Sequence, residues 1–367
     1  MPEGDAVPPP LPLQRETGIQ QVMTSTSVGK HPTAFTATGL PILRIALNPE
    51  EMTARLAPLL AQVGGPGGEP RVTYAKLLAY KQGNRGAVQY LVARDGGPPM
   101  AVLGKLYPQA SQAVRVDAIL SALWGAVFGG SPLLGVPRPL GCVPELSMMI
   151  YLPVDGRPLD EVLLGDEAGA AIELTAAWLA TLHRATLPLD RRFHAASELV
   201  NLTAWATLIA QSQPEQAEPA AHLAELLQRD AVRLRADVIV PIHKDFHYKH
   251  VLVDRGVRVI DFDEVRLGDP MHDVAHFCAH LRLLACRTRD APPGRFAALE
   301  RAFLDAYQRR GGAPLDERFP WFAASTCLKI AKQLCTVRGV RPRPDGEERG
   351  RQLAIMLAEG LAFGVGG

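Results

Sequence analysis

Two acidic residues, Asp245 and Asp261, stand where the sequence predicts the two ends of a β-hairpin. Asp245 precedes an apolar run at 251–253, and a turn of Asp, Arg and Gly then leads into a second apolar run, 257–260, which ends at Asp261. Two short apolar runs joined by a glycine-containing turn are typical of a hairpin. Because a hairpin brings its outer ends together, we expect both carboxylates to face one pocket. A β-branched run at 238–240 predicts a strand that leads into this unit.

A pair of carboxylates in one pocket suits phosphoryl transfer. That reaction needs metal ions to bridge the phosphate oxygens and a carboxylate to orient the attacking hydroxyl. By position, Asp245 is the candidate for the hydroxyl-orienting base, and Asp261 is the candidate metal ligand. Either residue alone would more often be a loop or helix-capping carboxylate. The hypothesis therefore rests on their ordered spacing.

The same stretch resembles the aminoglycoside phosphotransferase family, whose relatives include choline kinases and protein kinases. The catalytic loop of that family reads His-x-Asp-x-x-x-x-Asn, and His243-Lys244-Asp245 matches its opening. Ile260-Asp261 matches the strand that holds the metal. Gly268-Asp269-Pro270 and Asp273-Val274-Ala275 match the segment that follows, and the resemblance as a whole covers about residues 70–285.

The resemblance implies a small-molecule kinase that uses ATP and Mg²⁺. Its acceptor would be a small metabolite or an aminoglycoside-like compound that bears a hydroxyl group. The match places Asp245 and His243 in the catalytic loop, where His243 would brace the loop rather than act chemically. It places Asp261 on the metal, with Asp263 as a helper.

His250 departs from the family pattern, because it stands where the family has the Asn that carries the second metal. A neutral imidazole can bind a metal, but Mg²⁺ prefers oxygen ligands. His250 therefore remains a candidate metal ligand. The alternative function is a kinase-like protein that binds a nucleotide or metabolite with weak or no transfer activity.

The histidines of this region allow a third hypothesis, a zinc hydrolase. Two histidines four residues apart on one helix face can bind zinc. No Cys or Glu completes a recognised zinc signature here, so we favour core or surface roles. The histidines concerned are His243, His247 and His250 in the loop, and His272, His276 and His280 at helical spacing.

The region before residue 110 predicts a nucleotide-covering sheet. Alternating patterns indicate strands at about 71–80, 87–93 and 100–107, and a turn at 81–86 joins the first two. The resemblance implies that Gly83 and Gly86 bring backbone N–H groups to the phosphates and that Lys105 contacts them.

Kinases place a glutamate on the next helix to hold this lysine. The helix predicted at 110–128 offers only Gln112 and Asp117 as nearby polar candidates, so the partner of Lys105 is unassigned.

A strand predicted at 146–151 precedes a linker that matches the hinge between kinase lobes. The resemblance makes Met149 and Tyr151 candidates for adenine contact. The remaining chain is mainly helical in pattern. We therefore expect an α+β, bilobal, protein-kinase-like fold. It comprises a flexible leader at 1–40, an N-terminal lobe with an antiparallel sheet at 41–151, and a larger helical lobe at 152–367.

Composition sets limits on partners and compartment. The 367 residues carry a net charge of +1, which gives no bulk electrostatic signal for nucleic acid. No apolar run reaches about 18 residues, so no membrane span is expected. The five cysteines are scattered without a Cys-x-x-Cys pair, which indicates reduced thiols and a cytoplasmic protein. The oligomeric state stays open.

Four acidic residues near the predicted site bear on the acceptor. Together they would suit a cationic acceptor, such as an amino sugar or an amine. The structural interpretation is stronger for two of them, since Asp269 fits a helix N-cap and Asp273 fits a first-turn acid that holds the catalytic loop. The other two are Asp263 and Glu264.

Overall fold

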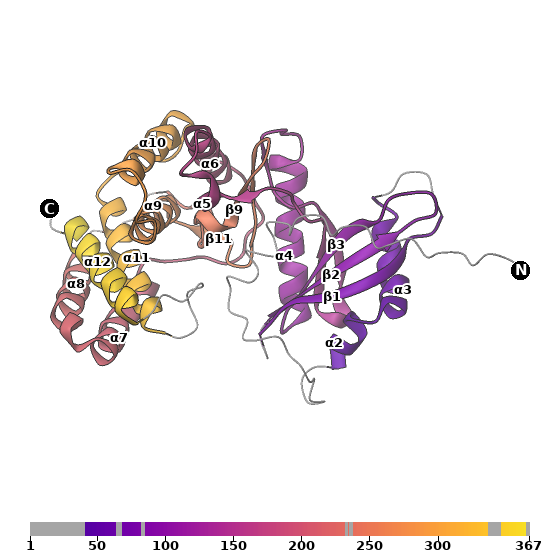
Figure 1. The fold of residues 1–367 in the computed structure, drawn as a ribbon, viewed down its shortest axis with the longest axis horizontal. Helices are drawn as coiled ribbons and strands as arrows, with labels where there is room; N and C mark the ends of the chain where they lie inside the picture. Colours follow the sequence, from indigo (N-terminus) through magenta and orange to yellow (C-terminus); the bar gives the residue numbers. More distant parts are fainter. Residues whose placement is uncertain are drawn as a thin grey trace, which may run out of the picture.

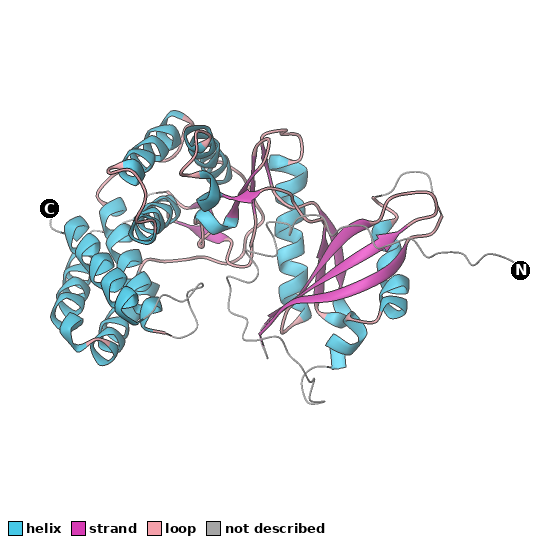
Figure 2. Cartoon of the chain, viewed as in Figure 1, coloured by secondary structure: helices cyan, strands magenta, loops and turns pink. Residues whose placement is uncertain are grey.

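The computed structural model describes residues 41–63, 68–81, 85–231, 234, 238–336 and 346–364. The predicted leader and Gly83 lie outside the described residues. The chain forms two lobes, one built around a sheet and one mainly of helices (Figure 1, Figure 2). The bilobal α+β fold predicted from the sequence is confirmed.

The N-terminal lobe is built on a five-stranded antiparallel sheet in the order β1-β2-β3-β6-β5. One face packs against two helices, and the first residues of the second are capped by Asn48 through its side chain. The other face packs against a third helix that continues into a π-helical turn. The strands are β1 (Arg71–Lys81), β2 (Arg85–Ala93), β3 (Met100–Leu106), β5 (Pro139–Val143) and β6 (Met148–Tyr151). The helices are α2 (Pro41–Ala46), α3 (Pro49–Leu60), α4 (Ala110–Ala122) and the turn Leu123–Phe128.

Strand alternation decides which side chains of β3 reach the site. Val102 and Leu106 are buried in the cluster beneath α2 and α3. Leu103 is buried on the opposite side, in the large cluster that extends into the C-terminal lobe. Because side chains alternate along a strand, Lys105 shares the face of Leu103 and points toward the other lobe.

Two small sheets support the catalytic loop in the C-terminal lobe. β9 and β10 pair antiparallel, with Val253 opposite Val257 and Val251 opposite Val259, so the predicted hairpin is present. The predicted strand at 238–240 is displaced and forms β8, which pairs with β11. The strands are β4 (Leu134–Gly135), β7 (Arg157–Pro158), β8 (Val240–Ile242), β9 (Val251–Val253), β10 (Val257–Val259) and β11 (Arg266–Gly268).

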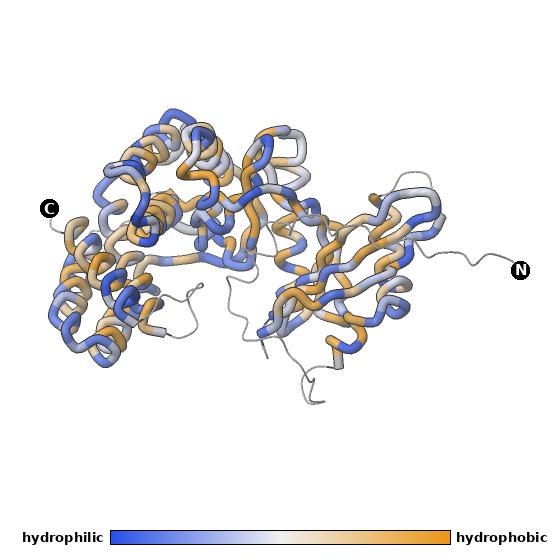
Figure 3. The backbone as a smooth tube through the Cα atoms, viewed as in Figure 1, coloured by the Kyte–Doolittle hydropathy of each residue, from blue (hydrophilic) through white to orange (hydrophobic). Residues whose placement is uncertain are grey.

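Helices form the rest of the C-terminal lobe. Hydrophobic residues recur along the sheet strands and through this helical lobe, where they form one continuous core (Figure 3). In the described part of the chain, no helix is long and apolar enough to cross a membrane. The helices are α5 (Leu159–Val162), α6 (Ala168–His183), α7 (Ala196–Ser212), α8 (Ala217–Asp230), α9 (Pro270–Arg287), α10 (Arg295–Arg309), α11 (Arg318–Cys335) and α12 (Gly346–Gly364).

Trp178 of α6 connects the catalytic loop to the segment below α4. Its fully buried ring stacks on Phe128 at 4.9 Å and on Phe246 at 5.7 Å between ring centroids. Its indole N–H donates a 2.9 Å hydrogen bond to the carbonyl of Gly135. Stacked aromatic rings with a satisfied N–H make a rigid support. Trp178 therefore supports the loop that carries Asp245 through its contact with Phe246.

Candidate active site

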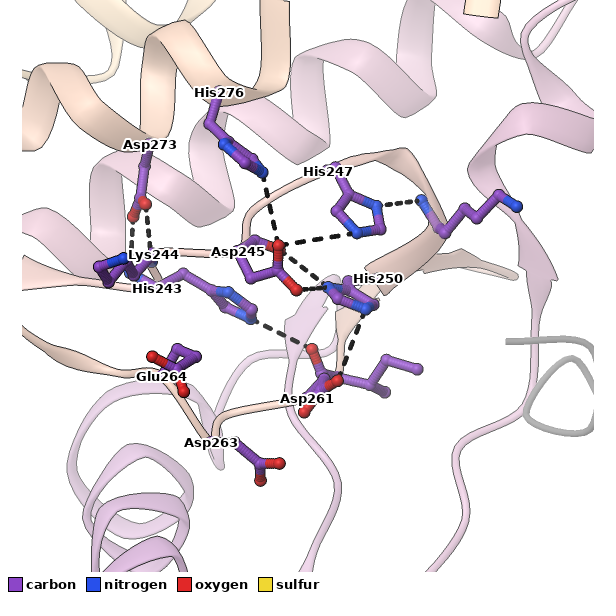
Figure 4. A network of polar contacts seen from close by, with 12 residues as sticks. His243, Lys244, Asp245, His247, His250, Asp261, Asp263, Glu264, Asp273 and His276 are labelled. Carbon is purple, nitrogen blue, oxygen red and sulfur yellow. Dashed lines mark hydrogen bonds and ion pairs between the residues drawn. The ribbon is translucent and has the colours of Figure 1, made fainter. Parts of the chain in front are cut away.

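Asp245 and Asp261 face one pocket, and the imidazole of His250 lies between them (Figure 4). His250 Nδ1 lies 3.8 Å from Asp245 Oδ2, and His250 Nε2 lies 3.6 Å from Asp261 Oδ2. The Asp245 side chain is 41% exposed and the Asp261 side chain 23% exposed, so both carboxylates are open to a ligand. The hairpin thus places the two carboxylates as its predicted geometry requires.

The backbone is strained at both ends of this pocket. Lys244, next to Asp245, has φ of 67°, and Asp261 has φ of 68°. L-residues rarely adopt this left-handed region, and such strain concentrates at functional sites. The surrounding hydrogen bonds must therefore hold both residues in place.

Asp273 in the first turn of α9 holds the catalytic loop. Its Oδ2 accepts a hydrogen bond from the backbone N–H of His243 at 2.6 Å, and its Oδ1 accepts one from Lys244 at 2.8 Å. Its carboxylate is fully buried, and burial raises the pKa of Asp273. Hydrogen bonds from His183 and His272 outweigh burial and leave that pKa far below its ordinary range. A buried, ionised carboxylate with several donors fixes the loop strongly.

His243 is buried and braces the second end of the pocket. Its Nε2 lies 3.1 Å from the carbonyl of Ile260, the residue before Asp261. Since a carbonyl only accepts, Nε2 carries the hydrogen. His243 therefore ties the loop of Asp245 to the strand end of Asp261, a bracing geometry.

Lys105 reaches into the pocket from the sheet lobe. Its Nζ donates to Asp261 Oδ1 at 2.9 Å and to Asp263 Oδ1 at 2.8 Å. Burial lowers the pKa of Lys105, but the two carboxylates outweigh it and raise that pKa well above its ordinary value. Lys105, Asp261 and Asp245 thus meet in one site between the lobes.

Asp263 is the buried carboxylate that holds Lys105. It also accepts a 2.8 Å hydrogen bond from the Tyr107 hydroxyl and forms an ion pair with Arg85 of β2. The described partners of Lys105 include neither Gln112 nor Asp117, and Asp117 instead lies beside the thiol of Cys142. Sequence reasoning named Asp263 as a metal helper but missed its partners Arg85 and Tyr107. The only available signal was their position on the strands beside Lys105.

The tautomer of His250 follows from its partner. Its Nδ1 lies 2.8 Å from the backbone carbonyl of Asp245, and this nitrogen must donate. In the neutral ring, Nε2 then presents a lone pair toward Asp261. A ligating histidine commonly donates its other N–H to a carbonyl, so His250 and Asp261 form a donor set that fits a divalent metal.

The loop histidines give a second possible metal cluster. Ligand atoms of Asp245, His247 and His250 all lie within 4.8 Å of one another. However, His247 Nδ1 accepts a hydrogen bond from the backbone N–H of Lys249 at 3.2 Å. The neutral His247 ring therefore carries its hydrogen on Nε2, the nitrogen that faces Asp245 at 4.0 Å. This arrangement suits a hydrogen-bond donor to Asp245 better than the zinc ligand of a hydrolase.

Two candidate nucleotide residues, Met149 and Tyr151, lie on the same face of the sheet as Lys105. Met149 pairs with Lys105 in the sheet, and Tyr151 pairs with Leu103; both side chains are buried in the large cluster. Gly86 is the second residue of β2 and lies opposite Leu106, where an added Cβ would approach the Leu106 side chain at 3.1 Å. Met149 and Tyr151 therefore lie on the inner face of the sheet with Lys105, whereas the side-chain position of Gly86 faces the opposite cluster with Leu106.

Comparison with protein families decides the class. The model of the phosphotransferase enzyme family matches residues 82–318. The chain belongs to this family. The match spans both lobes and every described site residue named above from Arg85 onward. The chain is thus an ATP-dependent phosphotransferase that acts on a hydroxyl group.

Solved structures show the same fold at low sequence identity. A Ralstonia eutropha protein described as an aminoglycoside phosphotransferase has a TM-score of 0.58 and 18% identity, over 85% of this chain and 98% of that one. A choline kinase from Cryptosporidium parvum has a TM-score of 0.54 and 14% identity, over 85% of this chain and 95% of that one. An amicoumacin kinase in complex with AMP-PNP, Ca²⁺ and Ami has a TM-score of 0.51 and 14% identity, over 85% of this chain and 95% of that one. A search of curated proteins found no match.

Proposed function

We propose that this phosphotransferase moves the γ-phosphate of ATP to a hydroxyl group of a small molecule, with Asp245 as the base and Asp261 as the Mg²⁺ ligand. The observation that carries the proposal is the convergence of Asp245, Asp261 and Lys105 in one pocket between the lobes. Two acids and one amine from separate lobes are the parts that phosphoryl transfer needs.

Asp245 acts on the acceptor. Burial raises its pKa, but the close contact with His276 at 3.4 Å and the charges of His247 and His250 outweigh burial and leave the pKa of Asp245 well below its ordinary value. The carboxylate is therefore ionised at neutral pH and can orient the acceptor hydroxyl and take its proton. Asp273 and His243 keep it in position, so most of its contribution is alignment.

Lys105 and Asp261 act on the nucleotide side. Lys105 is hydrogen-bonded to Asp261, and from this position its amine can contact phosphate oxygens. His250 Nε2 provides a second ligand atom for a metal beside Asp261. When bound, the metal supplies neutralisation of charge on the transferred phosphate. Met149, Tyr151 and the backbone near Gly86 lie where the adenine and phosphates of ATP would contact the sheet lobe.

A second candidate is a nucleotide- or metabolite-binding protein of this fold with little transfer. Its support is the ion pairing of Lys105 with two carboxylates, together with a histidine at the position of the second-metal Asn. In this arrangement the amine is already neutralised before ATP arrives.

One experiment separates these candidates. The protein is screened by thermal shift against sugars, amines, amino alcohols, hydroxy acids and aminoglycosides, with and without Mg-ATP, and ADP formation is measured for each compound that binds. The kinase proposal expects a compound that stabilises the protein only with Mg-nucleotide present and that drives ADP formation. Tight ATP binding without ADP formation for any compound would favour the binding protein.

A further inference from the structure

The side of Asp245 away from Asp261 is formed by histidines (Figure 4). His276 Nε2 lies 3.4 Å from Asp245 Oδ1, and His247 Nε2 lies 4.0 Å from the same oxygen. An acceptor hydroxyl directed at Asp245 would enter here, because Lys105 and the nucleotide residues occupy the opposite side. The chemistry of this wall therefore bears on the acceptor.

His276 is poorly satisfied for so buried a side chain. It is 2% exposed, and neither ring nitrogen has a hydrogen-bond partner of ordinary geometry among the described residues. Buried polar atoms normally have partners. Its ring is tilted against that of His280 with centroids 4.6 Å apart, and the His280 ring stacks on His247 at 4.7 Å. The three imidazoles form one surface beside Asp245, which we name the histidine wall.

Cationic side chains stand behind the histidine wall. Burial lowers the pKa of both His276 and His280, and the charge of Lys329 on α11 lowers both further. Seven residues before Lys329, and so on the same face of that helix, Phe322 packs against His272 with centroids 5.6 Å apart. This places the Lys329 face of α11 along the histidine face of α9. Arg287, two turns beyond His280, also lowers its pKa, and Nη2 of Arg287 is buried without a hydrogen-bond partner.

Carboxylates around this charge face other cations as well. Glu198 pairs with Lys244 at 3.5 Å, and Asp160 lies near Lys249 as well as Arg287. In the described part of the chain, the ion pairs of the histidine wall involve no carboxylate other than Asp245. The four nearby acids are held by other groups. Asp273 binds the loop backbone and His183, Asp269 caps α9 and pairs with Arg318, Asp263 pairs with Lys105, and Glu264 pairs with Arg266.

We propose that the acceptor is an anionic alcohol, whose carboxylate or phosphate group binds against His276, His280 and Lys329. The inference rests on the proposed function, since it assumes that the hydroxyl meets Asp245. Neutral imidazoles donate hydrogen bonds to an anion, and a lysine supplies the charge. A cationic acceptor would place its charge beside Lys329 and Arg287, and like charges in contact are unfavourable. The cationic acceptor suggested by the acidic residues of the sequence is thus disfavoured.

A matched series of alcohols tests the charge preference. The probes are 4-hydroxybutyrate, 4-hydroxybutyl phosphate, butane-1,4-diol and 4-aminobutan-1-ol, which share chain and hydroxyl and differ in the far group. Dissociation constants are measured by calorimetry on the full chain with Mg²⁺ and the non-hydrolysable analogue AMP-PNP. We expect at least one anion to bind about tenfold or more tightly than the amine, with the diol between them. The tighter of the two anions identifies the anionic group.

Variants at Lys329 test the assignment. Lys329→Gln is expected to bring the anion and amine to nearly equal affinity, and Lys329→Arg to preserve the preference. The control is Lys76→Gln on β1, an exposed lysine of the other lobe, which removes the same charge and should leave the preference unchanged. The proposal is overturned if the amine binds as tightly as the anions, if no probe binds, or if Lys329→Gln keeps the full preference. If the protein prefers the anionic alcohols but forms no ADP from ATP with them, the result would count against the proposed phosphotransfer function and leave the anion site supported.

Discussion

Lys105 Nζ in the sheet lobe donates a 2.8 Å hydrogen bond to Asp263 Oδ1 in the helical lobe. This contact joins residues 158 positions apart and supplies the carboxylate that the helix after Lys105 does not offer. Lys105 Nζ also donates a hydrogen bond to Asp261, which is two residues before Asp263 in the sequence. The two lobes are thus joined at the point where phosphate would bind.

The first prediction concerns this pairing. Asp263→Asn removes a nearly buried charge partner of Lys105, and we expect the KM for ATP to rise about tenfold while the KM for the acceptor changes little. Glu264→Gln is the matched control, because this adjacent acid is 41% exposed and pairs with Arg266 rather than with Lys105. Steady-state kinetics with varied ATP concentration test this prediction. An unchanged KM for ATP in Asp263→Asn would show that Lys105 does not need the contact with Asp263 to bind ATP.

The second prediction concerns His250 as a ligand. Nitrogen donors favour Mn²⁺ over Mg²⁺ more than oxygen donors do, so the protein should show a higher ratio of Mn²⁺-supported to Mg²⁺-supported activity than His250→Asn. Electron spin echo spectroscopy of bound Mn²⁺ gives a readout that does not depend on activity. We expect nitrogen coupling in the native protein and its loss in His250→Asn. If the native Mn²⁺ signal lacks nitrogen coupling, His250 is not a ligand.

The third prediction uses the depressed pKa of Asp273. A carboxylate with a lowered folded-state pKa stabilises the fold above its unfolded pKa of about 3.9, and this stability is lost as pH falls toward the folded pKa. At pH ~7, Asp273→Asn should cost about 2–4 kcal/mol, because donors of His243 and Lys244 lose a charged acceptor. Urea unfolding at a series of pH values should show the gap to native protein narrowing on acidification below about pH 5.

The matched control for the Asp273 series is Asp254→Asn in the exposed hairpin turn, which should unfold like the native protein at every pH. A gap between Asp273→Asn and native protein that stays constant with pH would contradict the assigned ionisation.

The local sequence pattern predicted much of the candidate active site. The hairpin follows from two β-branched runs and a glycine-containing turn, and its geometry places Asp245 and Asp261 together. The capping of α9 by Asp269 likewise follows from local rules, since its side chain accepts from the N–H of Met271. These features depend on neighbours in the sequence.

Features that depend on tertiary contacts could not be predicted from the sequence pattern. The predicted strand at 238–240 lies two residues further on, because pairing with Arg266–Gly268 sets its position. The partner of Lys105 comes from the opposite lobe, and no helical or strand periodicity encodes such a contact. The electrostatic character of the histidine wall depends on Lys329 of another helix, which no spacing rule links to Asp245.

The central claim is that Asp245 receives the proton of the acceptor hydroxyl beside a nucleotide held by Lys105 and Asp261. Its most direct test is acceptor-dependent ADP formation by Asp245→Asn, with the acceptor identified in the thermal-shift screen and nucleotide affinity measured in parallel. We predict a loss of at least about a hundredfold in kcat with nearly unchanged affinity for AMP-PNP, while Asp254→Asn retains full activity. Turnover by Asp245→Asn equal to that of the native protein would contradict the account.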